Sequence, residues 1–343
     1  MTSRNRCSGY SIVELMVALV IGLVLLLGVM AVFVSSRTSF DASETQAHMS
    51  DDGRFAMTLF GEDLRMAGTW GPNSFTNMVD NRTRGPGDRL GLLAPMAGDC
   101  ETAATPALFF TDLDQAVFAS NDVNPFIGPT PCISDYVAGT DVLVVRYADP
   151  NPVPDNLVAP GVVYVRSETG NSILFVGPAD PNDVPTIPPN GSNHVLRMHI
   201  YYVADFTEVA GDGIPSLHRV SLEAGPTLVD EMIVSGVENF QVQLGYDTAQ
   251  PEPDGEVNSY VNADSLIIDW TDTVDMARVR GARLWLMLRS GRPQKTAPTP
   301  PTYSMGGADF TPAAIGNPVI GEFKRLLISG VYDLRNFPLQ APR

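Results

Sequence analysis

The sequence predicts an α+β protein in which one long amino-terminal helix, first membrane-spanning and then amphipathic, precedes a large antiparallel β-rich globular head. No residue from Leu15 to Val34 is charged, and about 20 apolar helical residues span a hydrocarbon core of roughly 30 Å. Apolar residues then recur at helical spacing to about Ala67. Beyond Gly68 the chain changes to short apolar or alternating runs divided by Pro, Gly and Asn, which is typical of strands and turns.

These patterns divide the chain into four parts: a leader at 1–9, a transmembrane helix at 10–36, an amphipathic helix at 37–67 and the head at 68–343. The leader MTSRNRCSG carries Arg4 and Arg6 and no acidic residue, so the positive-inside bias holds it in the cytoplasm. No small-residue cleavage site follows Val34, so we expect the helix to be retained. The natural cut lies between Gly9 and Tyr10, where the polar leader meets the apolar run.

Glu14 is the one acidic residue at the start of this apolar helix. A carboxylate costs about 2.5–3.5 kcal/mol near the middle of a bilayer and less toward its surface. Cleavage after Gly9 would create a cationic amine on Tyr10, and an amine from one chain could neutralise Glu14 of another. The alternative is a plain single-pass anchor whose Glu14 lies at the membrane surface, near a favourable helix N-terminus.

The run Gly9-Tyr10-Ser11-Ile12-Val13-Glu14-Leu15-Met16 resembles the class III signal of type IV prepilins. The resemblance implies that a membrane aspartyl protease, the prepilin peptidase, cuts after Gly9 and methylates the new amine of Tyr10. It also implies that Glu14 neutralises the amine of a neighbouring subunit during assembly. The sequence departs from the common pattern in Tyr10, where Phe is usual, and in Ile12-Val13, and both changes keep an aromatic or branched apolar side chain.

The segment after the membrane run continues with helical periodicity. Phe33, Phe40 and Ala47 recur every seven residues, and a broad apolar face follows from Phe55 to Leu64. We expect this face to pack on the head. Four glycines lower helix propensity and mark places where the helix could bend or melt, namely Gly22, Gly28, Gly53 and Gly61.

The head is predicted to be dominated by strands. The candidate strands are 107–111, 141–148, 161–167, 172–177, 194–204, 216–222, 239–246, 282–290 and 323–332. Three stretches rich in Pro, Gly and Asn are expected to be linkers or long surface loops: 149–160, 178–193 and 292–318. Five blocks of the chain look like those of PilW-type minor pilins in the same order: 53–71, 138–148, 235–247, 279–290 and 323–336.

Composition and cysteine usage agree with an exported, loop-rich protein. The formal charge is −17, which argues against nucleic-acid binding. Cys7 lies in the leader, so Cys100 and Cys132 remain in the head, and outside the cytoplasm we expect them to form a disulfide. Closing a loop of about 33 residues would contribute roughly 3.5–4 kcal/mol in the chain-entropy model. The alternative is two free buried thiols.

Patterns of catalytic or metal-binding residues are scarce, so we expect no enzyme, no cofactor and no zinc site. His194 and His199 lie five apart in a predicted strand, which places them on opposite faces. One acidic loop concentrates oxygen ligands of the kind that Ca²⁺ takes, but it fails an EF-hand template at both ends, so the alternative is a solvated hairpin loop. Its candidate ligands are Asp247, Glu252, Asp254, Glu256 and Asn258.

The resemblance implies a structural minor pilin that helps to initiate type IV pilus assembly and lies in or at the tip of the filament, supporting pilus-dependent motility or adhesion. Its expected partners are other minor pilins, the major pilin, the prepilin peptidase and the inner-membrane assembly platform. The head would face the periplasm of a Gram-negative type bacterium before assembly and the exterior afterwards. The alternatives are a minor pseudopilin of a type II secretion system and a membrane-anchored exported enzyme or receptor.

Overall fold

One continuous helix begins the structure. The computed structural model describes residues 11–73, 113, 115–126, 132–225, 227–251, 253–268, 277–292, 301–312 and 323–336. Helix α1 spans Ile12–Met66, and its first backbone hydrogen bond runs from the N–H of Leu15 to the carbonyl of Ser11 at 3.1 Å. The helix ends before Gly68, whose φ of 77° provides the left-handed turn that commonly follows a helix C-terminus.

The chain divides into two compact units, Met1–Ser50 and Asp51–Arg343, and α1 contributes to both. The second unit is the head. Its last helical segment, residues 51–66, belongs with the strands that follow, so the head contains a helix as well as sheets.

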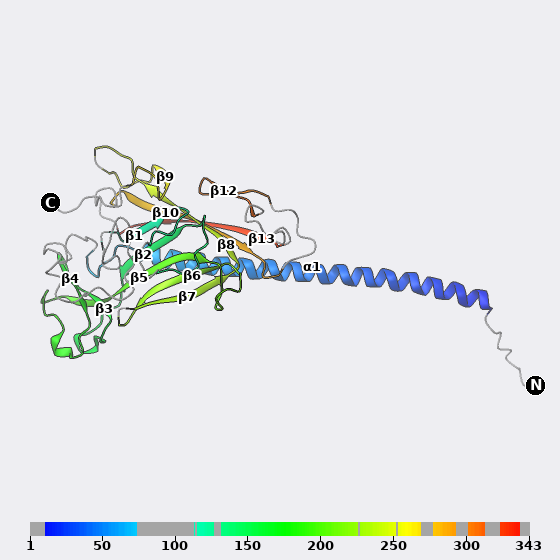
Figure 1. Ribbon diagram of the computed structural model, residues 1–343, viewed down its shortest axis with the longest axis horizontal. Coiled ribbons are helices and arrows are strands. Elements are labelled where there is room, and N and C mark those ends of the chain that lie inside the picture. Colours follow the sequence, from blue (N-terminus) through cyan, green and yellow to red (C-terminus); the bar gives the residue numbers. More distant parts are fainter. Residues whose placement is uncertain are drawn as a thin grey trace, which may run out of the picture. The chain divides into compact units, whose positions relative to one another are not determined.

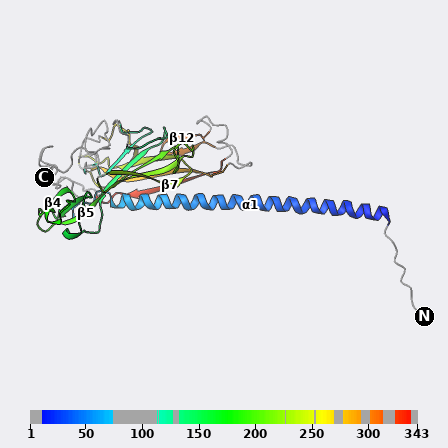
Figure 2. The ribbon, with the colours of Figure 1, turned by 60° about the horizontal axis from the view of Figure 1, so that its bottom comes forward.

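A seven-stranded antiparallel sheet forms one layer of the head (Figure 1). Its longest strand, β5, pairs with β2, β3 and β6, so this single strand organises the layer. The strands are β1 (Val117–Ser120), β2 (Val142–Ala148), β3 (Val163–Glu168), β4 (Asn171–Val176), β5 (Ser192–Ala204), β6 (Ser216–Glu223) and β7 (Thr227–Ser235). The β3–β4 hairpin and its adjoining loops gather at one end of the head in both views (Figures 1 and 2).

A four-stranded antiparallel sheet forms the other layer, in the order β13-β10-β8-β9. Its strands are β8 (Val237–Tyr246), β9 (Ser259–Asn262), β10 (Val279–Arg289) and β13 (Arg325–Asp333). A separate hairpin joins β11 (Tyr303–Met305) to β12 (Ala308–Phe310). Among the described residues, η3 (Asp155–Leu157) and η4 (Pro181–Asp183) are 3-10 helices.

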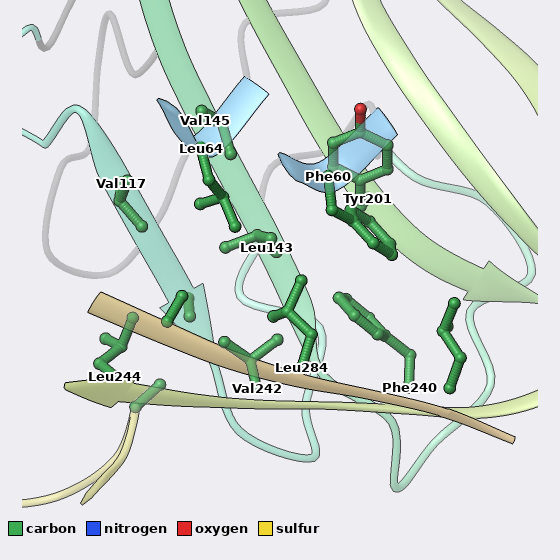
Figure 3. Close-up of a cluster of buried hydrophobic side chains, with 14 of the residues drawn as sticks. Phe60, Leu64, Val117, Leu143, Val145, Tyr201, Phe240, Val242, Leu244 and Leu284 are labelled. Carbon is green, nitrogen blue, oxygen red and sulfur yellow. The ribbon is translucent and has the colours of Figure 1, made fainter. Parts of the chain in front are cut away.

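The main hydrophobic core combines α1 with both sheets. Figure 3 shows Phe60 and Leu64 of α1 among side chains of the seven-stranded sheet, such as Leu143, and of the four-stranded sheet, such as Phe240 and Leu284. Because strand side chains alternate between faces, neighbours such as Val142 and Val144 join a second core on the opposite face of the larger sheet. Central strands of the seven-stranded sheet, such as β2 and β5, are therefore buried on both sides.

The structure confirms the α+β class and every predicted strand from 141 onward, with small differences at the ends. The candidate strand at 107–111 lies outside the described residues. Five strands were not predicted. Four of them are only three or four residues long (β1, β9, β11 and β12), too short to show a period. The fifth, β7, carries Asp230 and Glu231 in its middle, and these acids pair with His218 and Arg219 of β6.

The prediction of a linker or long surface loop at 292–318 was wrong for part of its described residues, because β11 and β12 lie within it. Gly306 and Gly307 form the turn between them with φ values of 61° and 86°, a conformation that glycine adopts without strain. The Gly306 carbonyl accepts a hydrogen bond from the Gln243 side chain at 2.6 Å, and Met305 is fully buried. The Gly-Gly pair was the sequence signal for this hairpin.

Candidate functional site

The amino-terminal part of α1 carries the predicted assembly residue. Glu14 is exposed and lies in the first helical turn, as the sequence predicted. Gly9 and Tyr10, the predicted cleavage site and methylated residue, lie outside the described residues. Their roles therefore stay predictions.

The apolar side chains of this helical segment are exposed in the described part of the chain. Large apolar residues from Ile12 to Val34 are 52–78% exposed, and the segment is long and apolar enough to cross a membrane, with a mean hydropathy of 3.1. Exposed apolar area destabilises a protein in water by about 25 cal/mol per Å². This surface needs lipid or other apolar helices around it.

The carboxyl-terminal part of α1 packs into the head through aromatic rings. The ring of Phe60 stacks on Phe240 with centroids 5.3 Å apart, and it meets Tyr201 edge-on at 4.7 Å. Such pairs add about 0.5–1.5 kcal/mol beyond the burial of their area. The expectation that the apolar face of this segment packs on the head is confirmed for Phe60 and Leu64, but it was wrong for Phe40 and Phe55, which are 80% and 56% exposed.

Two glycines permit this close packing. A Cβ at Gly53 would lie 2.1 Å from the Cδ1 atom of Ile328, and a Cβ at Gly61 would lie 2.8 Å from the ring of Tyr332. The Tyr332 hydroxyl donates to the backbone carbonyl of Met57 at 2.6 Å. Helix α1 is continuous through all four glycines, so the helix does not melt at any of them, and Gly53 and Gly61 are contact points with β13.

Asp63 fixes the same segment to the large sheet through polar contacts. Its carboxylate accepts hydrogen bonds from His199 Nδ1 at 2.5 Å, from the Tyr201 hydroxyl at 2.6 Å and from the Tyr147 hydroxyl at 2.9 Å. Only 4% of the Asp63 side chain is exposed. Sequence analysis did not single out this residue, although an acid three residues after Phe60 on the buried face of a helix was the available signal.

The electrostatics of this cluster favour an ionised Asp63. Burial raises the pKa of the carboxyl, but the bonds from His199, Tyr201 and Tyr147 outweigh that effect and hold the pKa below its ordinary value. Burial and the nearby Asp63 charge raise the pKa of Tyr147 and of Tyr201, so both phenols remain donors. The cluster is a set of matched donors around one acceptor group.

A second buried carboxylate joins the two sheets. Asp141 donates its backbone N–H to the Phe240 carbonyl at 2.8 Å, and its carboxylate accepts from the backbone N–H groups of Val242 at 2.6 Å and Asp122 at 2.9 Å. Burial raises the pKa of Asp141 to about 7, helped by the charges of Asp122 and Asp264 and opposed by the two N–H donors.

Cys132 is half-buried and disulfide-bonded. Cys100 lies outside the described residues, so the pairing of these two cysteines stays a prediction. The disulfide-bonded state of Cys132 excludes the alternative of a free thiol at that position.

The predicted calcium loop is held by its own backbone. Asp247 is fully buried, and its carboxylate accepts from the N–H groups of Ala249 and Gly255 at 2.9 and 2.6 Å. Asp254 and Asn258 likewise accept backbone N–H groups at 2.9 and 2.8 Å. No three His, Cys, Asp or Glu side chains among the described residues could hold a metal ion. The loop connects the paired strands β8 and β9, which is the arrangement expected of the alternative, a hairpin loop. Glu252 lies outside the described residues.

Three neighbouring side chains in the head, Ser216, His218 and Asp230, have the residue types of a catalytic nucleophile, base and acid. His218 Nε2 lies 3.1 Å from Ser216 Oγ, and His218 Nδ1 lies 2.9 Å from Asp230 Oδ1. Ser216 is fully buried and its hydroxyl donates to the carbonyl of Phe206, so this hydroxyl is closed to solvent in the structure. His194 and His199 lie on opposite faces of β5, as predicted, with His194 bonded to Ser192 and Asp149.

Two family models match the chain. Residues 4–30 match the prokaryotic N-terminal methylation motif, and residues 200–336 match the type IV pilus-assembly protein W family. The first match covers the leader, the predicted cleavage site and Glu14. The second covers strands from β5 to β13.

A type IV-like pilin from Thermus thermophilus is similar among solved structures, with 14% identity over 65% of this chain and 83% of that chain and a TM-score of 0.24. No curated protein matches the sequence.

The methylation motif and the apolar start of α1 fit a pilin that is anchored in the inner membrane and assembles into a pilus. The amino-terminal segment is thus similar to prepilins over residues 4–30. The head is similar to the type IV pilus-assembly protein W family over residues 200–336, so the predicted resemblance to PilW-type minor pilins is confirmed. Pilins of this kind are structural proteins, and their assembly implies contact with other pilins and with the prepilin peptidase.

Proposed function

We propose that this chain is a structural minor pilin that helps to initiate type IV pilus assembly and is incorporated in or at the tip of the filament. The observation that carries the proposal is an exposed apolar helix, with Glu14 in its first turn, in a chain whose head matches the PilW family. Other apolar helices can cover this surface as well as lipid can, so exchange from membrane to filament is physically reasonable. Motility or adhesion would follow from the filament.

In this proposal the prepilin peptidase cuts after Gly9 and methylates Tyr10. The methylated amine keeps its positive charge. Glu14 of one subunit then neutralises the Tyr10 amine of its neighbour within the apolar bundle, which removes two charges from a medium where each is costly. The partners are other minor pilins, the major pilin and the assembly platform.

A catalytic role has less support. The Ser216–His218–Asp230 arrangement is closed to solvent at Ser216, and its hydrogen bonds join β6, β7 and the preceding loop. We therefore infer that the head is structural and that these residues stabilise it.

Intact-mass analysis of the membrane-extracted chain, from cells with and without prepilin peptidase, tests the processing. A chain that begins at N-methylated Tyr10 only when the peptidase is present supports the proposal. A chain that keeps residues 1–9 in both cells refutes it and favours an anchored enzyme or receptor.

Substitution Glu14→Gln tests the assembly step, with Glu62→Gln on the exposed face of α1 as the matched control. We expect Glu14→Gln to be processed normally but to reduce surface pili strongly, and Glu62→Gln to assemble. Normal piliation by Glu14→Gln would contradict the charge-neutralisation mechanism. Deletion of the gene distinguishes a minor pilin from a type II secretion pseudopilin. The pseudopilin alternative requires a defect in secretion with normal piliation.

A further inference from the structure

Two proline-rich loops beside the β3–β4 hairpin are held together by side-chain hydrogen bonds. They comprise residues 149–162 and 177–191 (Figure 1) and are called here the paired loops. The guanidinium of Arg166 donates to Asp155 Oδ1 at 2.8 Å in the first loop and to the Pro188 carbonyl at 3.1 Å in the second. Asn193 adds bonds to Asp155 at 2.7 Å and to the Val153 carbonyl at 3.1 Å. A buried side chain thus holds both loops in one arrangement.

Each loop also buries one valine. Val158 and Val184 are 6% exposed and pack with the stacked rings of Tyr164 and Phe175. The loops therefore have a small core of their own. They are organised parts of the head, where the sequence suggested only linkers.

Next to these anchors the paired loops expose two large aliphatic side chains. Leu157 is 65% exposed and Ile187 is 63% exposed. Leu157 lies two residues after Asp155, and Ile187 directly precedes Pro188, so both are close in sequence to a partner of Arg166. Exposed prolines such as Pro154 and Pro189 extend this surface. Rigid apolar groups on a preorganised loop lose little conformational entropy when they bind.

The charged residues of the paired loops are all acidic. Asp149, Asp155, Asp180 and Asp183 lie within them, and neither loop contains a Lys or Arg. Asp180 and Asp183 are exposed on η4. Anionic lipid or nucleic acid would be repelled by this surface, and so would a second copy of the same loops. A protein surface with basic groups around an apolar centre is complementary to it.

We propose that the paired loops are a docking surface for a different protein, one that presents an apolar centre ringed by Lys or Arg side chains. Leu157 and Ile187 supply the apolar contact, and Asp180 and Asp183 supply the charge complementarity. The inference concerns the head alone and does not depend on assembly into a pilus.

Site-specific photo-cross-linking in intact cells tests this docking. The full chain would carry p-benzoylphenylalanine in place of Leu157 or Ile187. Val209 is the matched control position, because it is 67% exposed in another acidic loop that holds Asp205, Glu208 and Asp212. We expect one common partner at 157 and 187 that is absent at 209, with a cross-linked peptide that is apolar and bears Lys or Arg.

Charge removal by Asp180→Asn combined with charge reversal by Asp183→Lys completes the test. Asp180 Oδ1 accepts the backbone N–H of Asn182 at 2.9 Å, and Asn keeps that acceptor. The Asp183 side chain is exposed, so we expect thermal unfolding to be unchanged and the cross-link at 157 to fall at least tenfold. A cross-link at 157 and 187 no stronger than at 209 would overturn the proposal. So would a lipid adduct, a cross-link to a second copy, or a partner that persists after charge reversal.

Discussion

Replacement of Asp63 is the most direct test of how α1 is held on the head. In Asp63→Ala the donors of His199, Tyr201 and Tyr147 lose their common acceptor. Each buried donor left without a partner costs about 1–3 kcal/mol. These contributions overlap, so we expect the free energy of unfolding to fall by about 3–5 kcal/mol.

Urea unfolding of the detergent-solubilised full-length chain, followed by circular dichroism, measures this change. Asp149→Ala is the matched control, because the Asp149 carboxylate also accepts a side-chain hydrogen bond, from Arg197 at 3.1 Å, but at a more exposed position. Exposed pairs contribute about 0–1 kcal/mol. If Asp63→Ala loses no more stability than Asp149→Ala, the cluster does not hold the helix.

The pH dependence of the Asp63 effect has a definite sign. The pKa of Asp63 is lower in the folded protein than in the unfolded chain, so its stabilisation is present above the unfolded value of about 3.9. It is lost as the pH falls through the folded pKa. The difference between wild type and Asp63→Asn should therefore shrink below about pH 4, and a difference that stays constant to lower pH would refute the ionised carboxylate.

Further predictions concern packing and pH. Gly61→Ala should destabilise the head by about 1–3 kcal/mol, because the added methyl group would clash with the Tyr332 ring. Gly22→Ala is the control and should leave thermal unfolding unchanged, because a Cβ there would meet no atom within 4 Å. Equal effects of the two substitutions would contradict the contact role of Gly61. Tyr332→Phe should cost about 1 kcal/mol in urea unfolding, because the bond to Met57 is lost, and an unchanged midpoint would count against that bond. The folded pKa of Asp141, about 7, exceeds its unfolded value, so its stabilisation is present below about pH 4 and is lost as the pH rises through 7. Asp141→Asn should lower stability overall and flatten this decline, and an unaltered pH profile would refute the assignment.

The sequence by itself determined the long helix, its apolar and polar parts and the β-rich head, because those features follow from period and composition. An uncharged run from Leu15 to Val34 and the turn signal at Gly68 are local, and local signals survive without tertiary context. The pilin resemblance came from the short ordered motif around Glu14. Strands such as β5 were long enough to show their period.

The tertiary structure alone decided which residues hold these parts together. Asp63 is an ordinary acid in the sequence, and only the fold brings it to His199, 136 residues away. The charged residues in strand β7 hid it in the sequence, and only the structure shows that Asp230 and Glu231 pair with residues of β6. Gly53 and Gly61 lower helix propensity locally, yet the approach of β13 requires them to be small. Contacts between distant residues depend on the folded arrangement, and a local pattern does not encode that arrangement.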